Sequence, residues 1–244
     1  MSKVYVDAGH GGTDCGAVGV GGIKEKDINL AVAKYLQTEL KRQGFDIKMS
    51  RTSDTTKSLG ARTSEANNWD ADIVVSIHCN AFDDSSANGT ETYVYKYGYK
   101  SEMLANNVQI NLVSTLGTKN RGIKEGNLAM VRDTIAPAIL AELAFITNKT
   151  DCAKVDGANE QKKCAVCICK GICSFFGVTY KGEIKVANKT KFKDEDKMPK
   201  WATDSIKKAS DAGVMNGDAD GNFRPMDNLT RAEAAVIVAN LLNK

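Results

Sequence analysis

Residues 71–81 of this 244-residue chain read ADIVVSIHCNA. The stretch is apolar and rich in β-branched residues, which is typical of a strand buried on both faces of a sheet. Further strands are predicted over residues 3–8, 45–49, 89–95 and 138–145. Amphipathic helices are predicted over residues 27–44, 59–69, 101–117 and 159–177. Because strands alternate with helices, we predict an α/β fold with helices on both faces of the sheet. The strand over 89–95 has the alternation of a half-exposed strand.

The chain changes character towards its end. Residues 1–179 carry the α/β pattern, and a lysine-rich stretch without apolar periodicity begins near Lys181. We therefore predict a linker over 180–192 and a second, small domain over 193–244.

Two helical patterns occupy this tail, over about 200–212 and 230–242. Thr230 followed by Glu233 predicts a capping box at the start of the second helix. Some fifty residues are few for a self-sufficient core. We therefore expect the tail to pack against a copy of itself or against the first domain.

The composition indicates a soluble globular protein, with 42% hydrophobic and 26% charged residues. A net charge of +3 without an arginine-rich stripe does not favour a nucleic-acid partner. No apolar run approaches the roughly 18–20 residues that span a bilayer, so no membrane insertion is expected. The N-terminus lacks the apolar core of a secretory signal. We therefore expect synthesis in the cytoplasm and action after release.

Seven cysteines without a secretion signal indicate free thiols. Four of them lie in the predicted helix over 159–177: Cys164, Cys167, Cys169 and Cys173. At about 100° per residue they occupy two sides of that helix, so one helix cannot wrap them around one ion. Core packing is the favoured interpretation, and metal or redox chemistry is the alternative.

The chain has only two histidines, and each stands at the end of a predicted strand. His10 follows the strand over 3–8, and His78 ends the strand over 71–81. Strand ends of an α/β sheet can converge on one crevice, where such folds place their sites. The alternative is two unrelated histidines that only accept hydrogen bonds.

A glycine-rich loop over 11–27 could bring Glu25 back to His10. Two imidazoles and one carboxylate are a catalytic zinc set, in which a fourth position is left for water. Zinc lowers the pKa of that water to about 7. The alternative role for Glu25 is an acid that favours a helix N-terminus.

Glu142 interrupts the apolar strand over 138–145. A buried carboxylate is costly unless it is paired or functional, and burial raises its pKa towards a value useful for proton transfer. We therefore predict that Glu142 takes a proton from water and returns it to a leaving nitrogen. The alternative is a structural ion pair with an arginine such as Arg62.

Three segments resemble the motif blocks of the zinc-dependent N-acetylmuramoyl-L-alanine amidases of the Amidase_3 family. They are DAGHGGTDCGAVGVGGIKEKD (7–27), ARTSEANNWDADIVVSIHCNA (61–81) and RGIKEGNLAMVRDTIAPAILAELAFITN (121–148). The resemblance covers about residues 2–177. It implies a mixed, six-stranded sheet flanked by helices, and cleavage of the amide between N-acetylmuramic acid and the L-alanine of the stem peptide.

The family's functional residues fall on the four residues already singled out. The resemblance implies one Zn²⁺ bound by His10, Glu25 and His78, with Glu142 as the catalytic acid and base. Asn80, Arg62 and Lys124 are candidates for positioning the peptide of peptidoglycan. Two thiols, Cys15 and Cys79, lie beside the expected site.

The tail resembles one S-layer homology repeat, over FKDEDKMPKWATDSIKKASDAGVMNGDADGNFRP (192–225) and LTRAEAAVIVANLL (229–242). In that family such repeats bind secondary polymers of Gram-positive cell walls. Arg231 could grip a carboxylated sugar through its planar fork, and Trp201 is a second candidate. The family usually carries three repeats, so a single one suggests self-association, three chains supplying one each. A calcium loop around Asp218 is the rival interpretation of residues 216–227.

These features favour a peptidoglycan hydrolase of the endolysin type, with a tail that binds the wall. One rival is a wall-binding, S-layer-associated protein whose amidase domain is inactive. The other is a zinc peptidase that cleaves within the stem peptide.

Overall fold

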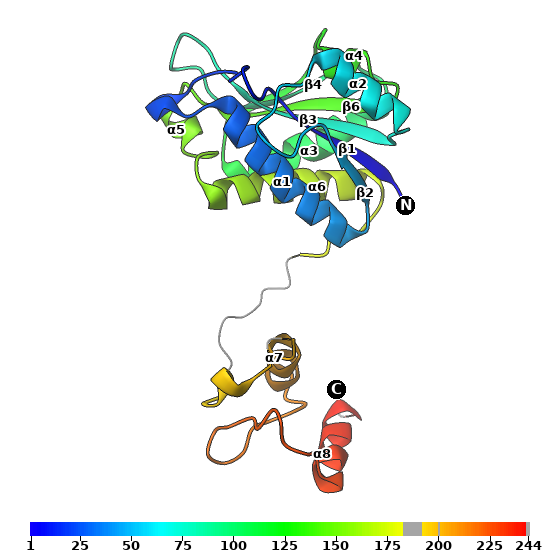
Figure 1. Cartoon of the computed structure of the whole chain (residues 1–244), viewed down its shortest axis with the longest axis vertical. Helices are drawn as coiled ribbons and strands as arrows, with labels where there is room; N and C mark the ends of the chain where they lie inside the picture. Colours follow the sequence, from blue (N-terminus) through cyan, green and yellow to red (C-terminus); the bar gives the residue numbers. More distant parts are fainter. Residues whose placement is uncertain (183–191, 200, 243–244) are drawn as a thin grey trace. The chain divides into compact units, whose positions relative to one another are not determined.

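The computed structural model describes residues 1–182, 192–199 and 201–242 (Figure 1). The chain forms two compact units, Met1–Lys181 and Gly182–Lys244. Most of the linker predicted over 180–192 lies outside the described residues.

A six-stranded sheet forms the centre of the first unit. Its strands are β1 (Lys3–Ala8), β2 (Asp46–Met49), β3 (Ile73–Asn80), β4 (Thr90–Val94), β5 (Asn120–Glu125) and β6 (Ala138–Phe145). Their order is β2-β1-β3-β6-β4-β5, and all neighbouring strands are parallel except β4 and β6. The mixed α/β sheet that the sequence and its resemblance predicted is confirmed.

Helices cover both faces of the sheet (Figure 1). They are α1 (Glu25–Gln43), α2 (Leu59–Asn68), α3 (Lys100–Leu116), α4 (Ala129–Arg132), α5 (Lys149–Cys152) and α6 (Ala158–Phe175). Helices α1, α3 and α6 pack on one face over the larger apolar core. Helices α2 and α4 lie on the other face over a smaller core that includes Tyr5, Val74 and Leu140. No described helix is both long and apolar enough to cross a membrane.

Helix α1 shows how the sequence pattern becomes structure. Its apolar face is fully buried at Ile28, Val32, Leu36 and Leu40, which are four residues apart. Gly44 ends the helix in the left-handed conformation, with φ of 87°. The helix begins at Glu25, two residues before the predicted start, and this places the Glu25 carboxylate in its first turn.

Strand β4 corrects one expectation. Its sequence predicts a half-exposed strand, but Thr90, Glu91 and Thr92 are buried. Their polar groups are satisfied internally; the Thr90 hydroxyl, for example, lies within hydrogen-bond distance of the Leu143 carbonyl. Two neighbours cover the strand. Helix α3 covers Thr92, which bonds to Gln109. Strand β5, a polar strand without a periodic signal, pairs with β4 and covers Glu91 through Arg121 and Lys124.

The four cysteines of α6 are buried and free, as the core-packing interpretation predicted. Burial raises the pKa of the Cys164 and Cys167 thiols, so both stay protonated and unreactive at neutral pH.

The second unit contains α7 (Thr203–Asp211) and α8 (Arg231–Leu242), close to the two predicted helices. The predicted capping box is present: the Glu233 amide donates to the Thr230 hydroxyl at 3.2 Å, and the Thr230 amide donates to the Glu233 carboxylate at 2.8 Å. A small apolar cluster of Phe192, Met198, Ala202 and Ile206 forms its core.

Candidate active site

The two histidines meet at the carboxyl ends of β1 and β3. These strands are parallel neighbours with Ala8 opposite Ile77, so His10 and His78 leave the same edge of the sheet. Their ring centroids are 4.9 Å apart. The predicted convergence of the two strand ends is therefore confirmed.

A tight turn after β1 makes this approach possible. A Cβ atom on Gly9 would lie 2.3 Å from the His78 ring, so position 9 accommodates only glycine. His10 itself adopts a left-handed conformation with φ of 59°, which a residue with a Cβ rarely adopts. The surrounding structure must hold it there.

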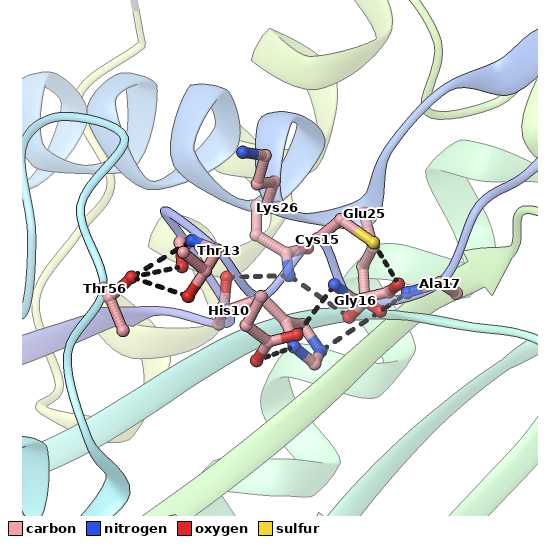
Figure 2. Close-up of polar contacts among 12 residues, drawn as sticks. His10, Thr13, Cys15, Gly16, Ala17, Glu25, Lys26 and Thr56 are labelled. Carbon is pink, nitrogen blue, oxygen red and sulfur yellow. Dashed lines mark hydrogen bonds and ion pairs between the residues drawn. The ribbon is translucent and has the colours of Figure 1, made fainter.

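Glu25 completes the cluster from the first turn of α1 (Figure 2). One carboxylate oxygen lies 3.2 Å from Nε2 of His10 and accepts the Ala17 amide at 3.0 Å. The other lies 2.9 Å from Nδ1 of His78 and accepts the Cys79 amide at 3.1 Å. The glycine-rich loop does fold back, and it brings three segments distant in sequence to one point.

Hydrogen bonds outside the cluster orient its members. The Asp14 carboxylate lies 2.8 Å from Nδ1 of His10, which leaves Nε2 turned towards Glu25. The Asn29 amide donates to Glu25 at 3.2 Å. Such outer partners fix the orientation of metal ligands. Neither Asp14 nor Asn29 carries a spacing signal that sequence reasoning could have used.

Hydrogen bonds and burial shift the pKa of each member of the cluster. The hydrogen bond to Glu25 raises the pKa of His10 to about 9, and Asp14 acts in the same direction. Burial opposes protonation of His78, but Glu25 outweighs it and the pKa of His78 is raised. Burial also opposes ionisation of Glu25, yet hydrogen bonds from both imidazoles lower its pKa. A cation that enters must displace the protons held here.

The donor set fits a metal ion. One ligand atom from each of His10, Glu25 and His78 lies within 4.8 Å of the others. Two imidazoles and one carboxylate on separate, internally braced segments are what a catalytic Zn²⁺ site requires. No other group of three such residues occurs in the described parts of the chain, so neither the cysteines nor the Asp218 loop forms one.

Glu142 lies on β6 directly beside His78 on β3. The side chain is half-buried, and its Oε2, which is buried, has no hydrogen-bond partner among the described residues. Burial raises the pKa of Glu142 to about 7, with Glu25 and Glu91 acting in the same direction against His78. The side chain is therefore a carboxyl that can exchange a proton near neutral pH.

The alternative partner for Glu142 is engaged elsewhere. Arg62 is buried and donates to Asp7 at 2.7 Å, to the Ala8 carbonyl at 2.6 Å and to the His10 carbonyl at 2.7 Å. Arg62 therefore holds the backbone of the His10 turn in place. This placement does not favour the expected role of Arg62 in gripping a peptide, since its donors are satisfied within the protein.

Asn80 and Lys124 meet at a residue that the sequence analysis missed. Glu91 is 2% exposed and lies beside Glu142 in the sheet. It accepts hydrogen bonds from Asn80 at 2.7 Å, Lys124 at 2.5 Å and Arg121 at 2.6 Å. An acid within a buried strand is the signal that identified Glu142. Glu91 was missed because β4 was expected to be half-exposed.

A cavity of about 330 Å³ opens beside the cluster. Its lining includes His10, His78, Asp14, Thr56 and Ser58. The metal-ligand cluster is therefore reachable from a cavity with several polar side chains in its lining.

A two-histidine, one-carboxylate centre at the strand ends of an α/β sheet, with a separate buried carboxyl beside it, defines a hydrolase site. The model of the N-acetylmuramoyl-L-alanine amidase family matches residues 4–174, and that of the S-layer homology domain matches residues 191–235. The chain belongs to the N-acetylmuramoyl-L-alanine amidase family and carries an S-layer homology domain at its end.

Named relatives and a solved structure agree with this assignment. The N-acetylmuramoyl-L-alanine amidase LytC of Bacillus subtilis is 40% identical over 176 residues, 71% of this chain and 35% of LytC. The endolysin of Bacillus phage SPP1 is 39% identical over 162 residues, 63% of this chain and 58% of the endolysin. The catalytic domain of CwlV, an amidase from Bacillus (Paenibacillus) polymyxa, superposes with a TM-score of 0.70 at 35% identity, covering 73% of this chain and 100% of that domain. The chain thus spans less than two thirds of both named relatives.

Proposed function

We propose that this protein cleaves the amide between N-acetylmuramic acid and L-alanine in peptidoglycan, with Zn²⁺ held by His10, Glu25 and His78. The observation that carries the proposal is the position of Glu142. A half-buried carboxyl, whose buried Oε2 has no hydrogen-bond partner, lies directly beside a metal-ligand set, where proton transfer would need it.

A bound Zn²⁺ would act as a Lewis acid towards a water molecule and the scissile carbonyl. Glu142 accepts the proton of the attacking water and delivers it to the leaving nitrogen of L-alanine. Its raised pKa suits both steps, because the carboxyl can take up and release a proton near neutrality. Asp14 and Asn29 keep His10 and Glu25 in place throughout.

Asn80 and Lys124 are proposed to position the stem peptide. Both are held at Glu91, next to Glu142. The Lys124 ammonium has three N–H donors. Those that do not bond to Glu91 can donate to a carbonyl or carboxylate of the substrate.

The wall-binding rival is weaker for a physical reason. A protein that only binds the wall gains nothing from a carboxyl oxygen that is buried without a partner, which costs free energy. A peptidase that cleaves within the stem would use the same groups, so only the products separate it from an amidase.

Digestion of purified Gram-positive cell wall tests the proposal. We expect new L-alanine amino termini without new reducing sugar ends, and loss of this release when a chelator removes zinc. Termini of other residues would indicate a peptidase. Absence of release by folded, zinc-loaded protein would favour the wall-binding alternative.

The tail is proposed to bind a secondary polymer of the Gram-positive wall. Arg231 is exposed at the start of α8, and Trp201 is 86% exposed. A cavity of about 550 Å³ adjoins α8, lined partly by Phe223, Arg224 and Leu229. The Asp218 carboxylate accepts two backbone amides and lies near Arg224, so it caps its own loop instead of offering a calcium site.

Arg231→Ala is expected to weaken binding to wall fragments about tenfold or more, because a hydrogen bond to a charged group contributes about 1.5–3 kcal/mol. Trp201→Ala is expected to act in the same direction. Lys208→Ala is the matched control, since it removes an exposed positive charge from α7 of the same unit. Co-sedimentation with wall fragments measures the effect, and an equal loss in all three variants would contradict a specific role.

Self-association through α8 is proposed as well. Beyond its first turn this helix is apolar except for Asn240, and none of its residues is buried; Val236, Val238, Leu241 and Leu242 are exposed. Such a helix is normally covered. Sedimentation of the full chain at micromolar concentration tests this, and a monomer counts against it.

We further propose an endolysin-type role, in which the protein reaches the wall after release from the cytoplasm. The phage relative supports this proposal. Expression in a host cell, with and without a co-expressed membrane pore, tests it. Lysis that does not require the pore counts against it.

A further inference from the structure

Arg51 occupies a buried position two residues after the end of β2, where it is 4% exposed. Its Nε donates to the Ala8 carbonyl at 2.9 Å. Its Nη2 donates to the Gly9 carbonyl at 2.9 Å and to the Lys26 carbonyl at 2.8 Å. A fourth hydrogen bond reaches the Ser53 carbonyl at 3.2 Å.

The carbonyls that Arg51 contacts belong to two separate segments. Ala8 and Gly9 immediately precede His10, and Lys26 immediately follows Glu25. One guanidinium therefore bridges the turn that carries one candidate ligand and the helix start that carries another. The third candidate ligand, His78, packs against Gly9, where a Cβ would touch its ring.

Packing alone does not explain an arginine here. The partners that carry its hydrogen bonds are neutral backbone carbonyls, whereas Asp7 is paired with Arg62 and Asp54 with Lys26. Burying a charge without a bonded counter-ion is costly, and an apolar side chain would fill the space at lower cost. What only arginine supplies is a rigid, planar fork that reaches several carbonyls at once.

We propose that Arg51 is a positioning residue that sets the spacing between the His10 turn and the start of α1, and so preforms the metal site before the ion arrives. The inference rests on the metal site under the proposed function, but it does not rest on the reaction.

The test compares Arg51→Lys with Arg42→Lys. Lysine keeps the charge but cannot bridge both segments. Arg42 is the control, because it pairs with Glu39 and Tyr180, outside the metal-ligand cluster. The readouts are the zinc dissociation constant by chelator competition, the visible spectrum of the Co²⁺ form, and the melting temperature without metal.

For Arg51→Lys we expect zinc affinity to fall about tenfold or more with an altered Co²⁺ spectrum, and for Arg42→Lys a change of less than about twofold. A folded Arg51→Lys with unchanged affinity and spectrum would overturn the inference. Failure of the wild-type chain to bind zinc would instead overturn the proposed metal site.

Hydrogen exchange on the wild-type chain provides a second test that does not depend on a variant folding. If the site is preformed, the amides of Gly9, Gly11 and Lys26, which donate to Ile77, Asp14 and Cys15, stay protected without metal. Rapid exchange that slows only when zinc is added would overturn the inference.

Discussion

Replacing Glu142 by glutamine is expected to lower release of L-alanine termini by about 10²–10⁴-fold, the usual contribution of a general acid and base. Glutamine has nearly the same shape but cannot accept and return a proton. Zinc affinity is expected to stay close to that of the wild-type chain, because Glu142 is not among the three clustered ligands. The measurements are the wall digest and a zinc titration of the same preparation.

Glu125→Gln is the control for this variant. Glu125 is a half-exposed carboxylate at the end of β5, bound to Lys96 and the Tyr97 amide, and the same substitution there is expected to leave activity unchanged. If Glu142→Gln kept most of its activity, another group would have to move the proton. Glu91, which lies opposite Glu142 in the sheet, would then be the carboxylate to examine.

The pH profile gives the same prediction an independent check. Only the ionised Glu142 accepts a proton, so activity is expected to rise with pH as this carboxyl ionises. Burial raises its pKa to about 7 without a metal, and a neighbouring cation favours the ionised form, so the midpoint should lie at or below about 7. The residual activity of Glu142→Gln should not show this rise with pH, because glutamine does not ionise.

Arg62→Met is expected to lower the free energy of unfolding of the first unit by about 3–5 kcal/mol, because removal of one partner leaves a buried charge uncompensated. The charge is that of Asp7, which is 1% exposed and bonded to Arg62 at 2.7 Å and to Ser76 at 2.6 Å. The variant also removes the donor that holds the His10 carbonyl. Arg62→Met should therefore lower the affinity for metal as well as the free energy of unfolding.

Arg132→Met is the matched control, because Arg132 forms an exposed pair with Asp133 at 2.6 Å. Exposed ion pairs contribute about 0–1 kcal/mol, so Arg132→Met should lower the free energy of unfolding clearly less than Arg62→Met does. Urea unfolding followed by Trp69 fluorescence measures the first unit, in a Trp201→Phe background that silences the other tryptophan. Equal destabilisation by both variants would show that burial of the Asp7–Arg62 pair is unimportant.

The pH dependence of this effect has a definite sign. Burial opposes ionisation of Asp7, but Arg62 and Ser76 outweigh it and hold the pKa of Asp7 below its usual range. A depressed pKa in the folded state stabilises the protein above the unfolded value, about 4 for aspartate, and the stabilisation is lost as pH falls through the folded value. The difference between wild type and Arg62→Met should therefore shrink in acid.

The sequence by itself determined the main elements and the four central residues. Strand β3 and helix α1 were predicted because an apolar run and an apolar stripe are local signals that burial preserves. His10 and His78 were predicted to meet because parallel strands place their carboxyl ends at one edge. Glu142 was identified because a charge in an apolar strand needs an explanation.

Only the tertiary structure decided how these residues are supported. Strand β5 carries no periodic signal, and without it the burial of β4 and of Glu91 could not be predicted. Arg51 contacts carbonyls 43 and 25 residues away, and Glu91 meets a lysine 33 residues away. Backbone carbonyls are the same at every position, so no residue pattern marks which of them a distant arginine will reach. A local pattern determines which face of an element is buried, whereas the partners of a buried charge depend on which segments the completed fold brings together.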